Sequence, residues 1–566
     1  MTLHLVHPAE AVEVVTVEPL RPLVEVGADL SATIDQAMSA LATDPSLYQR
    51  SDELVRVLPG EDGALRMLPH GAGSLRATMA RVAVWARSTP KGPQATTPPT
   101  DLATLVLESP ERWGAIRPLS GLATYPVLLP SGEVLRRPGY DEESRLVYAP
   151  TVDVGAVGET EDAAQEALRW LWVELCHDFP YAGLGYPEVS AADPDGVLRY
   201  LRARDCPSAW GVVAAILSML ARPAIAGDVP AVLFDASTPG SGKGLQIDMV
   251  ATAVLGRSVG KLTWPSHGGP QAEHTIEQSL GGEARMGSPV VVWDEIVGPF
   301  GGPSINRVLT SGGRTRFRLL GQTQVIDLPW TAVMLGAGNN IGWRDNTHRR
   351  VLVSRLEPPT DAPEKWDGAR RHPDLIPWVA AHRGEILRAA LTVLRAWVVA
   401  GRPDMGIRPW GGGYESWTMV ARAIRWAGGG DVLGCRVTAG EAVSEEQSQV
   451  MAIMVSMESI QPADGLAAGR LIDALFTPER LRGKGVDGEP LKPDGYEDAR
   501  DAIGAATRTR PGQRPDPAAL GRLFRTWRRR VVGGRVLDVV GTSHGSQRWA
   551  VRNVGSGSGS GGNNGR

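Results

Sequence analysis

A short loop of small residues that ends in a lysine is the part of the sequence best suited to chemistry. An apolar run at 231–235 precedes it, and a helical pattern at 245–255 follows it. Glycines in such a loop let backbone N–H groups surround a phosphate, the helix N-terminus adds a favourable dipole, and the lysine can reach the outer phosphates. We therefore expect the loop to bind ATP through Pro239, Gly240, Ser241, Gly242, Lys243, Gly244 and Leu245.

The loop departs from the usual pattern at two positions. Ser237 stands where the first glycine is expected, and Gly244 replaces the serine or threonine that normally contacts Mg²⁺. We expect the metal to be held by another residue or through water. Adenylate kinases are similar in using a Gly-Lys-Gly variant of the loop. A glycine-rich turn with an exposed lysine is the alternative interpretation.

A second apolar run, at 290–293, ends in two carboxylates, Asp294 and Glu295. Hydrolysis of a triphosphate needs a positioned base for the attacking water and a cation for the developing charge. We expect Asp294 to hold Mg²⁺ and Glu295 to orient and deprotonate the water. Apolar runs closed by acidic pairs also occur in ordinary strands, so the prediction depends on the preceding phosphate loop.

Two further polar groups follow in the chain. A third apolar run, at 330–338, ends in the amides Asn339 and Asn340, and a basic pair, Arg349 and Arg350, comes ten residues later. A guanidinium can stabilise transition-state charge on a nucleotide bound by a neighbouring subunit, which is the arginine-finger mechanism. The alternatives are a turn built on the asparagines and a salt-bridged basic turn.

Two arginine clusters predict contacts with DNA. Arg314, Arg316 and Arg318 alternate along one face of a predicted hairpin strand, a pattern suited to single-stranded phosphate backbones, although an edge strand protected by charge is also possible. Near the C-terminus, residues 501–550 hold ten arginines against three aspartates. A predicted helix that begins after Asp516 and two following strands favour a winged-helix-like unit for duplex DNA, although a solvated face would also carry such charge. The residues expected to contact DNA there are Arg522, Arg525, Arg528 and Arg529.

The order of these parts resembles superfamily 3 helicases, and in particular the AAA+ primase-helicase group of phages and plasmids. The resemblance implies a hexameric ring with ATP between subunits and single-stranded DNA in the channel. It also implies that Asn339 or Asn340 senses the γ-phosphate. The stretches that carry it are 291–296, 305–312, 336–340 and 346–351, with flanking pieces at 137–141, 414–417 and 426–431.

Length and composition limit which classes of protein this chain can belong to. The chain has 566 residues, 42% of them hydrophobic and 22% charged, which is typical of soluble globular proteins with several domains. The net charge of −4 confines DNA binding to local basic surfaces. Three isolated cysteines, the lack of a secretory signal and the lack of a long apolar run favour a cytoplasmic protein without membrane contact. Only six lysines stand among 59 basic residues, so a lysine at a mechanistic position is informative.

The fold that must position these residues is predicted to be multidomain α/β with an AAA+ type P-loop core. The predicted units are an α+β N-terminal region at 1–88, a linker at 89–104, a scaffold at 105–207, the ATPase core at 208–360, a helical domain at 361–465, a winged-helix-like domain at 466–551 and a Gly/Ser tail at 552–566.

The function that we expect is ATP hydrolysis that drives a DNA helicase or translocase in the replication of a phage, plasmid or mobile element. Two alternatives remain open. One is a nucleotide-gated DNA-binding or loading protein with little hydrolysis, suggested by Gly244, and the other is a P-loop kinase. No aspartate pair in a credible strand context supports primase chemistry.

Overall fold

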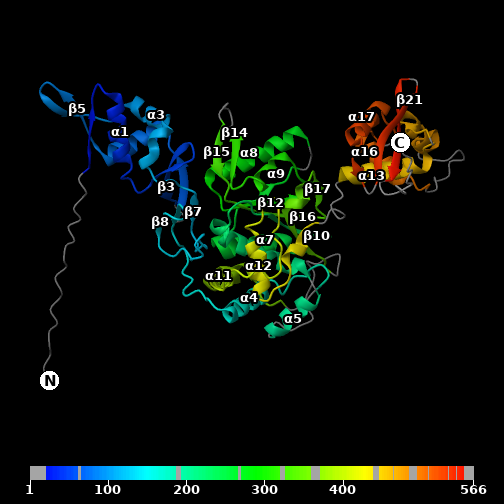
Figure 1. Ribbon diagram of the computed structural model, residues 1–566, viewed down its shortest axis with the longest axis horizontal. Coiled ribbons are helices and arrows are strands. Elements are labelled where there is room, and N and C mark those ends of the chain that lie inside the picture. The colour runs from blue at the N-terminus through cyan, green and yellow to red at the C-terminus, as the bar shows by residue number, and fades with distance from the viewer. Residues whose placement is uncertain are drawn as a thin grey trace, which may run out of the picture.

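A five-stranded parallel sheet lies at the centre of the computed structural model (Figure 1). Its strand order is β11–β12–β16–β10–β18. All six residues of β10 are buried, because helices cover both faces of a parallel sheet, and this explains the unbroken apolar run in the sequence. The strands are β10 (Ala231–Ala236), β11 (Leu262–Thr263), β12 (Val290–Ile296), β16 (Val333–Asn339) and β18 (Val351–Leu356). The structure describes residues 21–60, 65–185, 193–204, 206–265, 269–318, 325–358, 370–437, 445–462, 464–482, 494–507, 509–510, 512–532, 535–543 and 545–553.

The two faces of the sheet belong to two hydrophobic cores, and alternation along β10 divides them. Val232 and Phe234 belong to the larger core, whereas Ala231 and Leu233 belong to the smaller one. The larger core is built with α4 (Glu161–Leu175), α5 (Pro194–Arg204), α6 (Gly211–Leu220), α7 (Lys243–Leu255), α10 (Leu375–Ala381), α11 (Arg383–Val399) and α12 (Thr418–Trp426). The smaller core is built with α8 (Pro270–Met286), α9 (Pro303–Leu309), β14 (Arg314–Arg318) and β15 (Val325–Pro329).

Three units that the sequence separates share the larger core. Buried residues from 123 to 435 form one cluster, so the predicted scaffold, ATPase core and helical domain are built around a common interior. One reason is the packing of α4 against α11, because the apolar stripe of α4 contacts a helix that lies about 200 residues later in the chain. We call residues 118–437 the central body. Its other elements are β7 (Gly121–Ala123), β8 (Gly139–Asp141), β9 (Leu146–Tyr148), β13 (Pro299–Gly301), β17 (Gly342–Arg344), and the 3-10 helices η2 (Pro207–Trp210), η3 (Arg222–Ala224), η4 (Thr347–Arg350) and η6 (Val432–Cys435).

Residues 21–116 form an N-terminal unit with its own core (Figure 1, blue). The predicted linker at 89–104 differs from the structure, since it contains a strand and the start of a helix. Its prolines are accommodated because they lie in or beside the short strand β6 and just before α3. The elements are β1 (Leu23–Val26), α1 (Leu30–Leu41), β2 (Leu47–Arg50), β3 (Glu53–Pro59), β4 (Leu65–Pro69), α2 (Ala72–Val82), β5 (Val84–Thr89), β6 (Gly92–Ala95), α3 (Thr100–Leu107) and η1 (Pro110–Ala115).

A C-terminal unit at 445–553 also has its own core (Figure 1, orange to red). The helix α13 belongs to this core, so the unit begins before the predicted boundary at 466. The long antiparallel strands β21 and β22 pair with each other at its centre. Its elements are α13 (Glu445–Ile460), β19 (Leu466–Ala467), α14 (Ala468–Leu475), α15 (Pro478–Arg482), α16 (Glu497–Thr507), α17 (Pro517–Trp527), β20 (Val531–Val532), β21 (Arg535–Ser543) and β22 (Ser546–Asn553).

The whole is a mixed α/β multidomain protein. None of the helices among the described residues is both long enough and apolar enough to span a bilayer. The N-terminal residues 1–20 and the expected Gly/Ser tail beyond Asn553 lie outside the described residues.

A buried arginine joins the N-terminal unit to the central body. Arg50 donates to the carbonyl oxygens of Ala284 (2.7 Å) and Arg285 (3.0 Å) at the C-terminal end of α8. A cation at this end of a helix satisfies carbonyls that lack helical partners and interacts favourably with the helix dipole. Beside it, Arg285 forms an ion pair of 2.5 Å with Glu53. These hydrogen bonds at one helix end join the two units beside an apolar cluster that also spans them, formed by Tyr48, Val55, Val57, Met67 and Leu119.

We predict that Arg50→Met loosens this junction. Methionine fills the apolar volume but removes the donor of the Arg285 carbonyl, and it leaves the Ala284 carbonyl with only the backbone N–H of Gly287. A buried carbonyl left without a donor costs on the order of 1–3 kcal/mol. Limited proteolysis should then release the N-terminal unit several times faster than in the wild type. Arg87→Met, which changes an exposed arginine of the same unit, is the matched control. Equal release from both variants would contradict this role of Arg50.

Candidate functional site

Polar side chains gather where the parallel strands of the central sheet end. Ligands of open α/β sheets bind at the carboxyl ends of the strands, because the loops there open outward. The phosphate loop follows β10, Asp294 lies near the end of β12, Asn339 ends β16 and Arg355 lies near the end of β18. The structure thus brings the loop, the amide and the acidic strand to one edge of the sheet.

The loop itself needs glycine at two positions. Gly240 and Gly242 have φ angles of 72° and 97°, in the left-handed region that other residues rarely adopt. A Cβ atom at Gly242 would also lie 3.0 Å from the ring of Phe179. The helix α7 begins at Lys243 without a side-chain cap, so the first backbone N–H groups of α7 are available to an anion.

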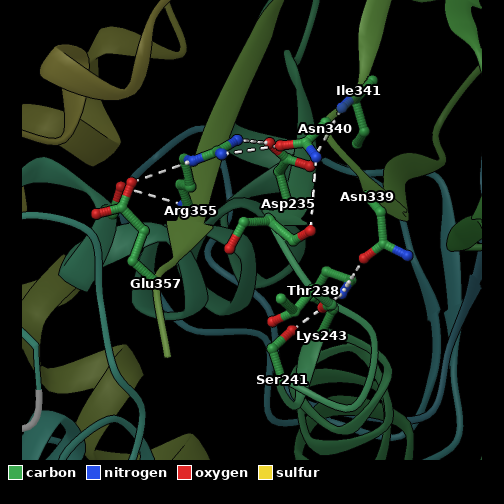
Figure 2. Close-up of polar contacts among 11 residues, drawn as sticks. Asp235, Thr238, Ser241, Lys243, Asn339, Asn340, Ile341, Arg355 and Glu357 are labelled. Carbon is green, nitrogen blue, oxygen red and sulfur yellow. Dashed lines mark hydrogen bonds and ion pairs between the residues drawn. The ribbon is translucent and has the colours of Figure 1, made fainter. Parts of the chain in front are cut away.

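Lys243 is buried, yet it is held only by neutral groups. Its Nζ donates to the carbonyl oxygen of Thr238 (3.0 Å), to Ser241 Oγ (2.9 Å) and to Asn339 Oδ1 (2.6 Å), as Figure 2 shows. Burial lowers the pKa of Lys243, and the charges of Asp235 and Asp294 oppose that effect. The result is a desolvated ammonium whose hydrogen-bond partners among the described residues carry no negative charge.

A second network holds the turn that follows β16. Arg355 pairs with Asp235 and donates to Asn340 Oδ1 at 2.9 Å (Figure 2). Asp235 Oδ1 accepts from the backbone N–H of Ile341 at 3.2 Å. Asn340 has a φ of 48°, which is uncommon for a residue other than glycine and is held in place by these contacts. Burial raises the pKa of Asp235, against the opposing charge of Arg355.

The two asparagines therefore act differently. Asn339 touches the loop lysine, whereas Asn340 donates from its side chain to the carbonyl oxygen of Ser237 at 3.5 Å and fixes the base of the loop. Of the other loop residues, Pro239 and Gly240 are exposed at its tip, and Leu245 packs against the larger core.

The acidic pair also has unusual backbone geometry. The register between β12 and β16 shifts between Trp293 and Ile296, and Glu295 has a φ of 50°. Asp294 Oδ1 accepts the backbone N–H of Glu295 at 2.9 Å. This bulge turns the carboxylate of Glu295 to the solvent, where it is exposed. Bulges of this kind re-aim side chains at functional sites.

The donors near Asp294 do not match a usual magnesium site. Lys261 lies 3.4 Å from Asp294 Oδ2 and 3.0 Å from Asp248 Oδ1, so an ammonium already faces this carboxylate. Gly244 offers no hydroxyl group. Magnesium prefers octahedral oxygen ligands, mostly water, carboxylate and phosphate. The side chains present here fit an ammonium better than a divalent ion.

Arg349 and Arg350 lie away from this cluster. They precede β18, and its six residues span about 17 Å from the opposite edge of the sheet to the loop. Arg350 donates to Asn346 O (2.8 Å) and Asn306 Oδ1 (3.3 Å). Arg349 is exposed, and its guanidinium has no hydrogen-bond or ion-pair partner in the described parts of the chain.

The basic strand has the predicted alternation. Arg314, Arg316 and Arg318 are exposed on one face of β14, while Thr315 and Phe317 are buried on the other. The strand pairs with β15 in antiparallel register. The turn expected at Gly321-Gln322 lies outside the described residues.

The C-terminal arginines are divided by the end of a helix. Asp516 caps α17 through the N–H groups of its first turn, as the sequence indicates. Arg522 and Arg525 are exposed on this helix, but α17 ends at Trp527. Arg528 and Arg529 therefore do not continue the helical face, and both form ion pairs with Asp538, at 2.7 and 3.1 Å.

Sequence reasoning missed three charged residues of the site: Asp235, Lys261 and Arg355. Asp235 and Arg355 each stand at the end of an apolar run, which is a signal that both strands open on the same edge. Lys261 is one of only six lysines in the chain. Its rarity was the one available signal, because the pairing of β11 with β12 joins residues about thirty positions apart.

Comparisons with known proteins name no family for this chain. No protein-family model matches the chain, and no curated protein matches it. Among solved structures, an apo structure titled as the NrS-1 C-terminal region is 10% identical and covers 88% of this chain and 95% of its own, with a TM-score of 0.33. A second apo structure of that region, residues 305–718, has the same identity and a TM-score of 0.30, and the match covers 88% of this chain and 96% of that one. Likeness at this level carries no argument about fold or function.

We predict that Arg355→Met destabilises the protein by leaving Asp235 buried without its cation. The loss should be on the order of 1–3 kcal/mol, at the lower end because Arg355 is partly exposed. Adding Asp235→Asn should recover part of it, since a neutral amide needs no cation. Glu357→Gln, which changes the exposed carboxylate 3.4 Å from the same guanidinium, should have little effect. Denaturant unfolding measures these proteins together with Asp235→Asn alone and the wild type, and additive effects of the Arg355 and Asp235 substitutions would contradict the coupling.

Proposed function

We propose that the protein binds ATP at the loop 239–245 and hydrolyses it to drive movement along DNA, as a helicase or translocase of the AAA+ type. One observation carries the proposal. The buried ammonium of Lys243 has only neutral hydrogen-bond partners, so it is a positive charge without an ion-pair partner among the described residues, beside an open helix N-terminus. A desolvated cation in this setting favours an anionic ligand, and a phosphate chain supplies the missing charge.

The residues around Lys243 suit phosphate hydrolysis. Asn339 ends the strand between the loop strand and the acidic strand, and its amide oxygen accepts from Lys243 at 2.6 Å, which supports a role for the amide at the phosphates. Glu295 is exposed at the same edge and is the base that we propose for the attacking water. A Mg²⁺ ion on Asp294, expected from the sequence, is not required by the proposal, because Lys261 already places positive charge against that carboxylate.

The DNA part of the proposal rests on charge and on the resemblance to superfamily 3 helicases. The exposed arginine face of β14 presents three guanidinium groups at alternate positions, which suits a single-stranded phosphate backbone. Arg522 and Arg525 on α17 are the proposed duplex contacts of a winged-helix-like unit. Replication of a phage, plasmid or mobile element and a hexameric ring follow from the same resemblance.

A second candidate function is a nucleotide-gated DNA-binding or loading protein that hydrolyses ATP slowly. Gly244 favours it, because the loop lacks the hydroxyl that normally joins the metal to the phosphates. The two candidates share the nucleotide site and differ only in turnover.

We predict that single-stranded DNA stimulates ATP hydrolysis by the wild type and that Glu295→Gln reduces the stimulated rate by about a hundredfold or more, as expected for loss of a general base. ATP binding should persist in this variant and be lost in Lys243→Ala. Phosphate release and equilibrium binding measure the two properties. Binding without turnover in the wild type would support the second candidate, and no binding would refute both.

We also predict that Arg349 acts on the nucleotide of a neighbouring subunit, since it lies at the far edge of its own sheet. Arg349→Ala and Lys243→Ala should each be inactive alone. When the two variants are mixed, the mixture should regain part of the hydrolysis rate. A Lys243→Ala subunit can supply its Arg349 to the intact loop of a neighbouring Arg349→Ala subunit. Arg350→Ala is the matched comparison, since Arg350 is tied to Asn306 within its own chain. No recovery on mixing would contradict action between subunits.

A further inference from the structure

The loop departs from its usual pattern at the residue next to Lys243. A hydroxyl at this position normally brings a divalent cation to the phosphates, and Gly244 has none. A Cβ atom built on Gly244 would lie 3.9 Å from Lys261 Nζ. The space into which a serine or threonine would project is therefore bordered by an ammonium group.

Two carboxylates hold Lys261 in this place. Asp248 comes from α7, one turn beyond Gly244, and Asp294 comes from β12. Lys261 Nζ lies 3.0 Å from Asp248 Oδ1 and 3.4 Å from Asp294 Oδ2. The three groups come from separate segments, and each side chain keeps about a third of its surface exposed. The ammonium is thus fixed on two sides and open on another.

The electrostatics keep Lys261 charged. Burial lowers the pKa of Lys261, but the hydrogen bond to Asp248 and the charges of Asp248 and Asp294 together outweigh burial, and the net shift is upward. Lys243 directly precedes Gly244 in the chain and has only neutral hydrogen-bond partners among the described residues. A phosphate chain in the loop would therefore meet two ammonium groups, one from the loop and one from the residue that precedes β11.

We propose that Lys261 is a second phosphate-binding lysine, which supplies the positive charge that a hydroxyl-bound divalent cation supplies in the usual loop. The inference rests on the proposed ATP site and concerns how that site neutralises its ligand. It also gives a reason for glycine at 244: a Cβ there would make only ordinary contact with the ammonium, but a hydroxyl would compete with it for the same phosphate oxygens. It also means that triphosphate binding depends little on Mg²⁺.

Replacing Lys261 should make triphosphate binding depend on a divalent cation. Without the ammonium, Asp248 and Asp294 face the phosphate site as two uncompensated carboxylates, and they repel a free triphosphate. A divalent cation then becomes necessary to bridge the carboxylates and the phosphates, because carboxylate and phosphate oxygens are the ligands that Mg²⁺ prefers. The variant should bind nucleotide only with the metal, whereas the wild type binds it in either condition.

The test is equilibrium binding of a fluorescent ATP analogue to the full chain, in excess EDTA and in excess Mg²⁺. The wild-type affinity should differ by less than about threefold between the two conditions. Lys261→Met should lose about ten- to a hundredfold in EDTA and recover most of it with Mg²⁺. Lys261→Arg should keep most of the wild-type behaviour, since it retains the charge. Lys91→Met, an exposed lysine of the N-terminal unit, is the matched control.

The ratio of the affinity in Mg²⁺ to the affinity in EDTA distinguishes a phosphate-binding role of Lys261 from a structural one. If Lys261 merely braces β12 against α7, Lys261→Met lowers the unfolding temperature while the ratio stays at the wild-type value, and that result overturns the inference. A wild type that needs Mg²⁺ as strongly as the variant overturns it as well, and leaves the ATP site standing. If the wild type binds no analogue in either condition, the proposed function falls and this inference falls with it.

Discussion

A buried lysine without a negatively charged hydrogen-bond partner is the constraint on which the rest of this structure depends. The ammonium of Lys243 has left water, and a carbonyl, a hydroxyl and an amide hold it in place. Neutral groups compensate desolvation only in part, which is why its pKa is lowered. A phosphate ligand would supply the negative charge that these neutral partners lack.

The parallel sheet makes the arrangement possible. Because β16 lies between β10 and β12, the amide at its end contacts the loop lysine, and the acidic strand is the neighbour of β16 on the other side. Arg355, at the end of β18, ties the turn after β16 to Asp235 on β10. Because Asn339 and Asn340 contact the loop at Lys243 and Ser237, we expect a change in the bound phosphates to alter the contacts of both asparagines. The same edge holds both strained non-glycine residues of the site, Glu295 and Asn340.

Much of this site could be located from the sequence, because its parts are local. The loop follows β10 directly, and the acidic and amide residues lie at the ends of β12 and β16. Each apolar run in the sequence therefore indicated which residue stands at the end of a strand. Long-range contacts were not visible. Lys261 meets Asp294 through the pairing of β11 with β12, and α4 finds its packing partner in α11. For the same reason, three predicted domains proved to share one core, and the predicted linker proved to contain β6 and the start of α3. Arg528 and Arg529 fitted the helical spacing of α17, but the helix ends one residue earlier. The roles given to these residues in binding ATP and DNA stay predictions.

The most direct test of this account is an experimental structure of the protein with a non-hydrolysable ATP analogue. The account predicts that the γ-phosphate lies within hydrogen-bonding distance of Lys243 Nζ, with the phosphate chain wrapped by the backbone N–H groups of residues 240–245. A structure in which Lys243 keeps its contacts with Thr238, Ser241 and Asn339 while the analogue binds elsewhere, or not at all, would contradict it.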